Sequence, residues 1–399
     1  MLTSMFMSLL PLCFASGGNQ DADLGEPSAP AVALYRLCDA AWTPQPERFD
    51  ILLYRERQLK QLSREEVRTL VEEALEAASP GASSTATEHK ELVEANIDNI
   101  LKERNAPRRI IQRIVQDGER QRVGMVILRP EQEPSSARLS DWYFTLGSNT
   151  DSEGRNAMQV TGEFRIARIL PGGMRFAGTP VEEWLSVPFK PVIQMMVGAV
   201  EEPGKVSLSQ ERLQDVLSGD SGVAIRVTRV KDPRYSSGPL ERVEIVDVAS
   251  GQVRVAILCD REDYGRTYEV VAQNHATGNP MQTFTRRGHL PNNVATELEM
   301  RTYDESGSLV ESDRLFFLCV DFSPVFKPGE WELRVPPGYG LIDGRETPDE
   351  VLSVPEAQSA EIGDTIREVL AAARPESIVK QNLVRVGVPI PRGSDGNQE

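Results

Sequence analysis

Apolar side chains alternate with polar ones in many short segments from residue 122 onward. Val123, Met125 and Ile127 stand two residues apart, and the same period recurs in many short segments up to Val335. This period is typical of strands with one face on a core, and turns rich in Gly, Pro, Ser and Asp separate the segments. The pattern predicts antiparallel strands at 123–127, 142–144, 158–166, 223–230, 241–248, 252–259, 266–272, 281–285, 295–303, 309–320 and 331–335.

Helical spacing replaces this alternation before residue 118. Ser63 and Glu66 have the spacing of a capping box, and apolar residues then repeat every three or four positions as far as Ala78. The same spacing predicts a second helix over 92–101 and a third over 110–115. Shorter helices are predicted over 209–217, capped by Ser209, and around 362–370.

These elements predict an α+β fold, in which N-terminal amphipathic helices precede a large curved antiparallel sheet that forms an unclosed half-barrel. The turn 304–308 is expected to close a hairpin between two of the strands. The predicted organisation is a signal peptide at 1–16, a flexible leader at 17–50, a helical segment at 51–118, an antiparallel β domain at 119–345, and a short helix with a disordered tail at 346–399.

Composition and charge narrow the function classes. The 399 residues include 44 Lys and Arg against 60 Asp and Glu, and the net charge of -16 disfavours binding to nucleic acid. Residues 1–15 form a short apolar run followed by small residues, as in a secretory signal, although no Lys or Arg precedes Arg36. The run is shorter than the ~20 residues of a spanning helix. We therefore expect a periplasmic or secreted protein of the cell envelope without a transmembrane segment.

The cysteines give no metal or redox motif. Cys13 leaves with the signal peptide if that peptide is cleaved, which leaves Cys38, Cys259 and Cys319 widely spaced and without a CxxC pair. Cys259 and Cys319 lie in apolar strands, where a free cysteine acts as a small core residue. A disulfide between these two residues is the alternative, because spacing does not fix connectivity.

Candidate catalytic residues do not stand out. His89, His275 and His289 are the three histidines, and a metal site of His275 and His289 with Asp260 or Asp263 matches no known ligand spacing. We expect these histidines to be exposed. Hydrolase, zincin, NTPase and EF-hand signatures do not occur, so the sequence predicts no catalytic residue, no metal site and no cofactor, and identifies no ligand-binding residue.

A basic island interrupts this acidic chain near the end of the second predicted helix. It consists of Lys102, Arg104, Arg108, Arg109 and Arg113. Such a cluster is commonly a solvated face with acidic neighbours. The alternative is a docking site for an acidic partner.

Three short motifs resemble the periplasmic lipoprotein-carrier fold of the LolA and LppX type. They are the polar segment Tyr268–Pro280, the hairpin Tyr303–Gly307, and Leu333–Gly338 with Asp343 after it, and the resemblance covers roughly residues 120–345. It implies a strongly curved, unclosed sheet that wraps around helices and leaves a hydrophobic cavity for acyl chains.

The sequence thus supports an exported, non-enzymatic carrier or binding protein for a lipid or other hydrophobic ligand. A structural or interaction protein of the cell envelope, whose apolar faces fill one another, is the first alternative. An enzyme with an unrecognised carboxylate site is the second. A hollow sheet face would favour the carrier, and a filled one the envelope interaction protein. A polar cleft of converging Asp, Glu and His would indicate the enzyme.

Overall fold

The computed structural model describes most of the chain between residues 28 and 391. The described residues are 28–43, 46–78, 94, 97–98, 101–102, 105–118, 120–146, 156–161, 165–171, 184–197, 200–202, 205–207, 210–235, 238–274, 276–327, 329–332, 335, 337–344, 351–352 and 363–391.

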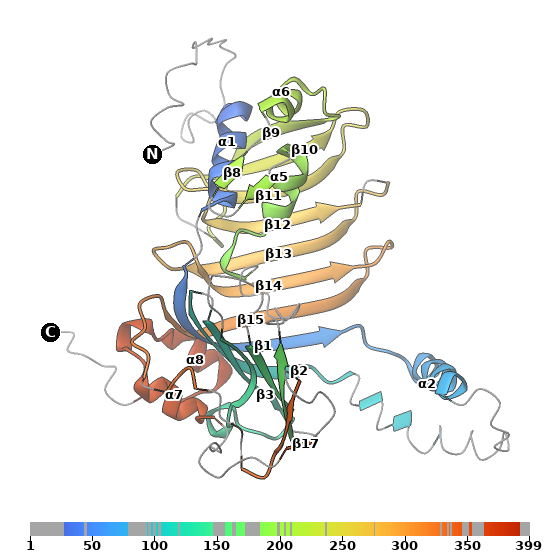
Figure 1. The fold of residues 1–399 in the computed structure, drawn as a ribbon. Coiled ribbons are helices and arrows are strands. Elements are labelled where there is room, and N and C mark those ends of the chain that lie inside the picture. Colours follow the sequence, from blue (N-terminus) through green and yellow to red (C-terminus); the bar gives the residue numbers. More distant parts are fainter. Residues whose placement is uncertain are drawn as a thin grey trace.

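The described strands form one 15-stranded open sheet and a separate two-stranded ribbon (Figure 1). All neighbours in the large sheet are antiparallel except β16 and β6, which are parallel. In sheet order the strands are β17 (Val351–Leu352), β16 (Gly340–Asp343), β6 (Ile166–Pro171), β5 (Asn156–Thr161), β4 (Ser140–Leu146), β3 (Arg120–Leu128), β2 (Arg108–Asp117), β1 (Arg48–Leu59), β15 (Leu309–Asp321), β14 (Ala295–Tyr303), β13 (Pro280–His289), β12 (Thr267–Gln273), β11 (Val253–Asp260), β10 (Leu240–Asp247) and β9 (Val223–Val230); the ribbon pairs β7 (Val200–Glu202) with β8 (Lys205–Ser207).

The structure describes six helices and two short 3-10 turns. They are α1 (Pro30–Ala41), α2 (Arg64–Ala78), α5 (Lys190–Val197), α6 (Gln210–Ser218), α7 (Ile366–Ala372) and α8 (Lys380–Val386), with short 3-10 turns η1 (Pro134–Ser136) and η3 (Pro375–Ser377). Figure 1 shows α1, α5 and α6 over the β9–β12 end of the sheet. We call the face beneath them the covered face and the opposite one, which carries α7 and α8, the outer face.

Strand β1 joins the two halves of the sheet and is buried on both faces. Phe49, Ile51 and Leu53 pack on the covered face, whereas Leu52 and Tyr54 pack on the outer face among residues of α7 and α8. The covered face is continuous from β13 to β15, because Arg286, Leu298 and Leu315 pair across these three strands. The fold is therefore α+β with an open sheet, as the sequence predicted.

The predicted third helix is wrong, because residues 108–117 form strand β2 between β1 and β3. Ile111 lies on the outer face and Ile114 on the covered face, and both are fully buried. A strand that is buried on both faces carries apolar residues without strict alternation, and here they fall at a helix-like spacing. Since 48–59 is also a strand, the region 51–118 is not a helical segment throughout.

Two terminal regions are more ordered than the sequence suggested. Within the expected flexible leader, Pro30 starts α1, and Leu34 and Leu37 of this helix are fully buried. Within the expected disordered tail, α8 buries Leu383 completely. Both helices are short, so their apolar residues are too few to mark a helix face in the sequence. The packed face becomes evident only from the residues that it contacts. The division into domains stays a prediction.

Several other elements agree with the sequence. The Ser63 amide donates to the Glu66 carboxylate (2.8 Å) and the Glu66 amide to the Ser63 hydroxyl (3.2 Å), which confirms the capping box of α2. The strands from β9 to β15 form the predicted meander, and α6 occupies the predicted short helix, although Ser209 lies outside the described residues. Most of the second predicted helix also lies outside them; its described residues, 94, 97–98 and 101–102, are helical.

The last predicted strand, 331–335, is described only in part, because residues 333 and 334 lie outside the described residues. Val335 forms an isolated bridge and is buried beside Met158, Val160 and Ile169. A regular strand, β16, begins at Gly340. The hairpin loop at 304–308 is confirmed, with Gly307 at a φ of 84° that favours glycine.

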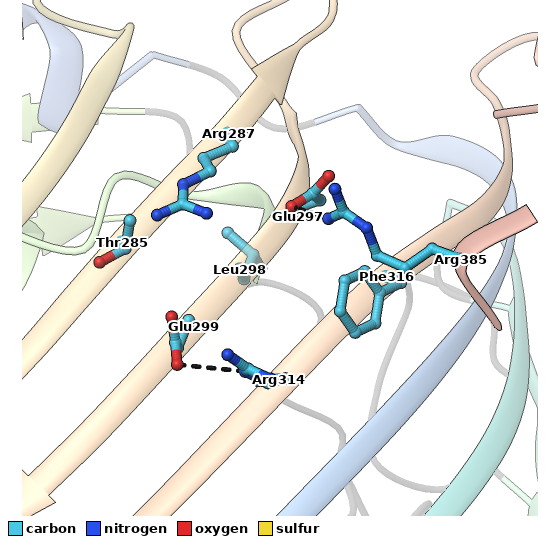
Figure 2. Close-up of a pocket in the computed structure, with 8 residues that line it drawn as sticks. All are labelled: Thr285, Arg287, Glu297, Leu298, Glu299, Arg314, Phe316 and Arg385. Atoms are coloured by element: carbon cyan, nitrogen blue, oxygen red, sulfur yellow. Dashed lines mark hydrogen bonds and ion pairs between the residues drawn. The ribbon is translucent and has the colours of Figure 1, made fainter. Parts of the chain in front are cut away.

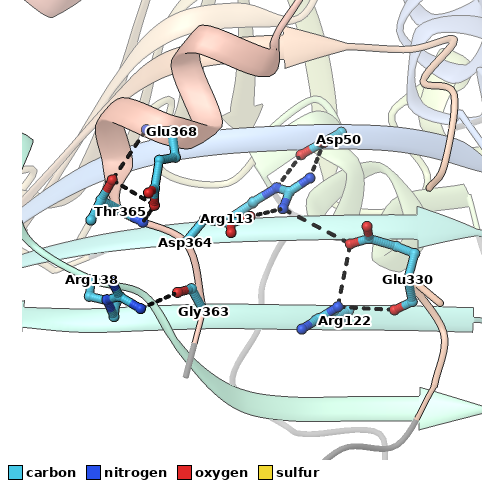
Figure 3. Close-up of polar contacts among 9 residues, drawn as sticks. All are labelled: Asp50, Arg113, Arg122, Arg138, Glu330, Gly363, Asp364, Thr365 and Glu368. Atoms are coloured by element: carbon cyan, nitrogen blue, oxygen red, sulfur yellow. Dashed lines mark hydrogen bonds and ion pairs between the residues drawn. The ribbon is translucent and has the colours of Figure 1, made fainter. Parts of the chain in front are cut away.

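An arginine on β2 ties the C-terminal part of the chain to the outer face (Figure 3). Arg113 donates to both carboxylate oxygens of Asp50, at 3.0 and 2.7 Å, and lies 4.0 Å from carboxylates of Glu330 and Asp364. These carboxylates raise the pKa of Arg113 against the opposing effect of its burial. The turn at 329–332 and the start of α7 are thus both anchored on the same strand.

Candidate functional site

The β9–β12 end of the covered face is a broad apolar surface. Its buried members alternate along neighbouring strands, and Val243 and Ile257 are completely buried. The strand residues of this surface are Val223, Val243, Ile245, Val255, Ile257, Cys259 and Val270, with Ile225, Val227 and Phe284 at its margin. Each points inward because side chains two residues apart on a strand share a face.

Three short helices close this surface. Helix α1 begins with a proline, which suits a first helical turn, and presents Leu34 and Leu37 to the sheet. Ile193 of α5 and Leu213 of α6 complete the cover, and each is at most 1% exposed. With 12, 8 and 9 residues, these helices are too short for stable isolated helices in water, so their order depends on this apolar contact.

A buried carboxylate fastens the start of α1 to the sheet. Glu241 is fully buried on β10 and accepts hydrogen bonds from the Tyr264 hydroxyl (2.5 Å), the Ser28 amide (2.9 Å) and the Ser28 hydroxyl (3.0 Å). Arg36 of α1 donates to the Arg261 carbonyl at 2.6 Å nearby. A charge taken out of water needs such partners, and here the partners come from the segment that carries the cover.

Sequence reasoning missed Glu241, Tyr264 and Ser28. The available signal was that Glu241 stands at an inward position of β10, in register with Val243 and Ile245. A carboxylate at a core position of an alternating strand indicates a buried polar contact. Its partners come from residues 23 positions ahead and 213 positions behind, which no local pattern links.

The electrostatics around the covered face give no reactive group. Burial, followed by the hydrogen bond to Glu241, raises the pKa of Tyr264 far above its usual value. Burial also raises the pKa of the Cys38 thiol to about 12 and that of Cys259 well above its normal range. All three described cysteines are free and buried, which agrees with core residues and is contrary to a Cys259–Cys319 disulfide. Protonated buried thiols are poor nucleophiles.

Of the three histidines, the structure describes His289 alone. His89 and His275 lie outside the described residues. His289 is not freely exposed as expected: its Nε2–H donates to the Thr267 carbonyl at 3.0 Å and its ring contacts Tyr268 edge to face. Burial and the neighbouring Arg286 lower the pKa of His289 to about 4. Among the described residues no three His, Cys, Asp or Glu side chains gather as a metal site.

The basic island is divided among separate contacts. Arg113 is engaged in the network of Figure 3, and Arg109 donates to the Pro130 carbonyl at 2.7 Å. Arg104 lies outside the described residues. Arg113 is therefore a structural residue of the sheet, and the docking site for an acidic partner stays a prediction for Lys102, Arg104, Arg108 and Arg109.

The geometry defines an α+β protein with an open antiparallel sheet, whose apolar face is closed by three helices. No described helix is long and apolar enough to cross a bilayer. No family model matches the sequence, and no curated protein matches it.

Solved structures give distant likenesses. A LolA superfamily protein from Nitrosomonas europaea aligns over 75% of this chain and 96% of its own, at 10% identity and a TM-score of 0.29. A domain described as an outer membrane lipoprotein-sorting protein, from Vibrio parahaemolyticus, aligns over 76% and 97%, at 10% identity and a TM-score of 0.30. The fold description rests on the topology above.

Proposed function

We propose that this protein is an exported carrier or binding protein for a lipid or other hydrophobic ligand, and that it has no catalytic activity. The observation that carries the proposal is the apolar covered face beneath three short helices. The apolar run at residues 1–15 supports export to the periplasm or cell surface.

The proposed mechanism of ligand uptake follows from how α1, α5 and α6 are attached to the sheet. An acyl chain gains ~0.8 kcal/mol for each CH2 group removed from water, so it can replace the contacts of Leu34, Ile193 and Leu213 with the sheet. The polar attachment at Glu241 lies at the start of α1, where it resists displacement of that helix. Ligand entry then requires α1 to move while β9–β12 keep their pairing.

A second candidate is an interaction protein of the cell envelope with a filled core. It is favoured by the completely buried side chains of Phe189, Val243 and Ile257, which already occupy the space between helices and sheet. The two functions differ in whether a hydrophobic molecule enters this contact.

The first experiment is native mass spectrometry of the protein purified from a bacterial envelope, followed by extraction of any retained molecule and titration with a fluorescent fatty acid. The carrier function predicts a stoichiometric acyl ligand or saturable uptake. Tyr264→Phe removes one donor to Glu241 and should increase the uptake rate several-fold, whereas Tyr54→Phe on the outer face should not. A protein that is empty and takes up no fatty acid in either form would support the filled-core alternative.

A further inference from the structure

A polar pocket lies on the outer face, away from the covered face. It has a volume of about 260 Å³ and lies over β13, β14 and β15 beside α8 (Figure 2). Its lining residues are Thr285, Arg287, Glu297, Leu298, Glu299, Arg314, Phe316 and Arg385. Sites for larger organic ligands usually exceed about 300 Å³, so this pocket suits a small ligand or the end of a larger one.

The two carboxylates of the pocket are already neutralised. Arg314 contacts Glu299 at 3.1 Å, and Arg385 contacts Glu297 at 2.5 Å. The glutamate side chains are only 17% and 14% exposed, whereas both arginines are at least half exposed. An entering molecule therefore meets guanidinium N–H groups before it meets carboxylate oxygens.

Arg287 supplies the positive charge in excess, because three arginines line the pocket against two glutamates. Within the described part of the chain it forms no ion pair, and Figure 2 draws no ion pair between its guanidinium and either glutamate. A guanidinium has five N–H donors in a planar fork that matches a carboxylate. The pocket thus offers one cation that no carboxylate of the described residues neutralises.

An apolar surface lies across β14 from this cation, since Arg287, Glu297 and Phe316 pair in register on β13, β14 and β15. The ring of Phe316 lines the pocket, and the Arg385 guanidinium lies 5.6 Å from its centroid. A ligand that carries one negative charge and a short apolar group would use Arg287 and Phe316 together. One excess positive charge matches a monoanion, whereas the second charge of a dianion would lie near Glu297 and Glu299 without a cation of its own.

We propose that this outer-face pocket binds the carboxylate of a small molecule or chain end that carries an apolar group. Arg287 pairs with the carboxylate, the apolar group lies against Phe316, and Arg314 and Arg385 keep Glu297 and Glu299 from repelling the ligand. The site is independent of the proposed carrier function, since it uses the opposite face of the sheet.

Isothermal titration at low salt tests the site with four probes: hexanoate, hexanamide, and an N-acetylated tripeptide ending in leucine with a free or an amidated carboxyl end. We expect each acid to bind about tenfold more tightly than its amide, as a charge-assisted contact requires. A tighter tripeptide acid would identify a peptide chain end as the ligand, and a tighter hexanoate a small acid.

Three variants locate the binding. Arg287→Gln should abolish the preference for the acids, while Arg226→Gln should retain it, because Arg226 is an exposed arginine elsewhere on the outer face that pairs with Glu244. Tyr264→Phe should leave the preference unchanged, which separates this site from the covered face. Equal binding of acid and amide, no binding of either acid, or a preference that survives Arg287→Gln would overturn the proposal.

Discussion

At the residue scale, the informative groups are ionisable side chains placed where apolar ones are expected. Glu241 is satisfied by Tyr264 and Ser28, so its burial stabilises one position of α1. Arg286 is buried without a carboxylate and donates to the carbonyls of Gly265 and Asn293 at 3.4 and 3.0 Å, and burial lowers its pKa to about 10. After burial, the positive charge of Arg286 also lowers the pKa of His289, which therefore stays neutral.

His289 should make stability depend on pH in a defined window. Its pKa is about 4 in the folded protein against 6.5 ordinarily, so above pH 7 it is neutral in both states and contributes no pH dependence. As the pH falls below 6.5, the unfolded chain takes up the proton first, and the free energy of unfolding should fall by up to about 3 kcal/mol by pH 4.

Urea unfolding at pH 7.0 and 4.5 measures this effect. The loss on acidification should be smaller in His289→Gln than in the wild type by roughly 2 kcal/mol, because glutamine does not titrate. Carboxylates contribute to acid unfolding in both proteins and cancel in the comparison. Equal losses in the two proteins would show that His289 titrates normally.

At the element scale, single strands and short helices depend on contacts with distant parts of the chain. Strand β2 is held between β1 and β3, and its Arg113 also anchors the turn at 329–332 and the start of α7. The α7 start has its own capping box, in which the Glu368 amide donates to the Thr365 hydroxyl at 3.3 Å. Local caps set where these helices begin, and the ion pairs set where they lie.

Replacing Arg113 should be costly. Arg113→Met leaves the carboxylate of Asp50, which is 24% exposed, without its cation and leaves Glu330, which is 10% exposed, with Arg122 alone, and should lower the free energy of unfolding by about 3 kcal/mol. Arg64→Met is the matched control: its pairs with Glu94 and Asp98 are exposed, and the expected loss is about 1 kcal/mol or less. Urea denaturation of both variants checks this, and similar losses would contradict a structural role for the Arg113 network.

At the scale of the whole molecule, the sheet has two apolar faces that are closed by different ends of the chain. The N-terminal helix α1 closes the covered face with α5 and α6, and the C-terminal helices α7 and α8 close the outer face over β1, β2 and β15. Ile366 and Leu383 are fully buried in the second contact. An open sheet of this length could not leave both faces uncovered in water.

Removal of residues 346–399 should therefore uncover an apolar surface. We expect the truncated protein to bind a hydrophobic dye several-fold more strongly than the full chain, whereas removal of residues 392–399 alone should change nothing, because α8 remains. Far-UV circular dichroism shows whether the sheet persists.

A second variant, Leu383→Ala, should lower the free energy of unfolding by about 2–5 kcal/mol with the chain otherwise intact. Unchanged dye binding after truncation would show that the C-terminal helices do not cover the sheet.

The sequence by itself determined the strands from β9 to β15, the start of α2 and the α+β class, because these depend on local alternation, turn residues and capping. Only the tertiary structure decided that residues 108–117 are a strand, since Ile111 and Ile114 are buried on opposite faces and lose the alternation that marks a strand. It also decided the candidate sites. Glu241 meets Ser28, and Arg385 meets Glu297, across long separations in the chain, and such pairings follow from sheet order and helix packing rather than from neighbouring residues.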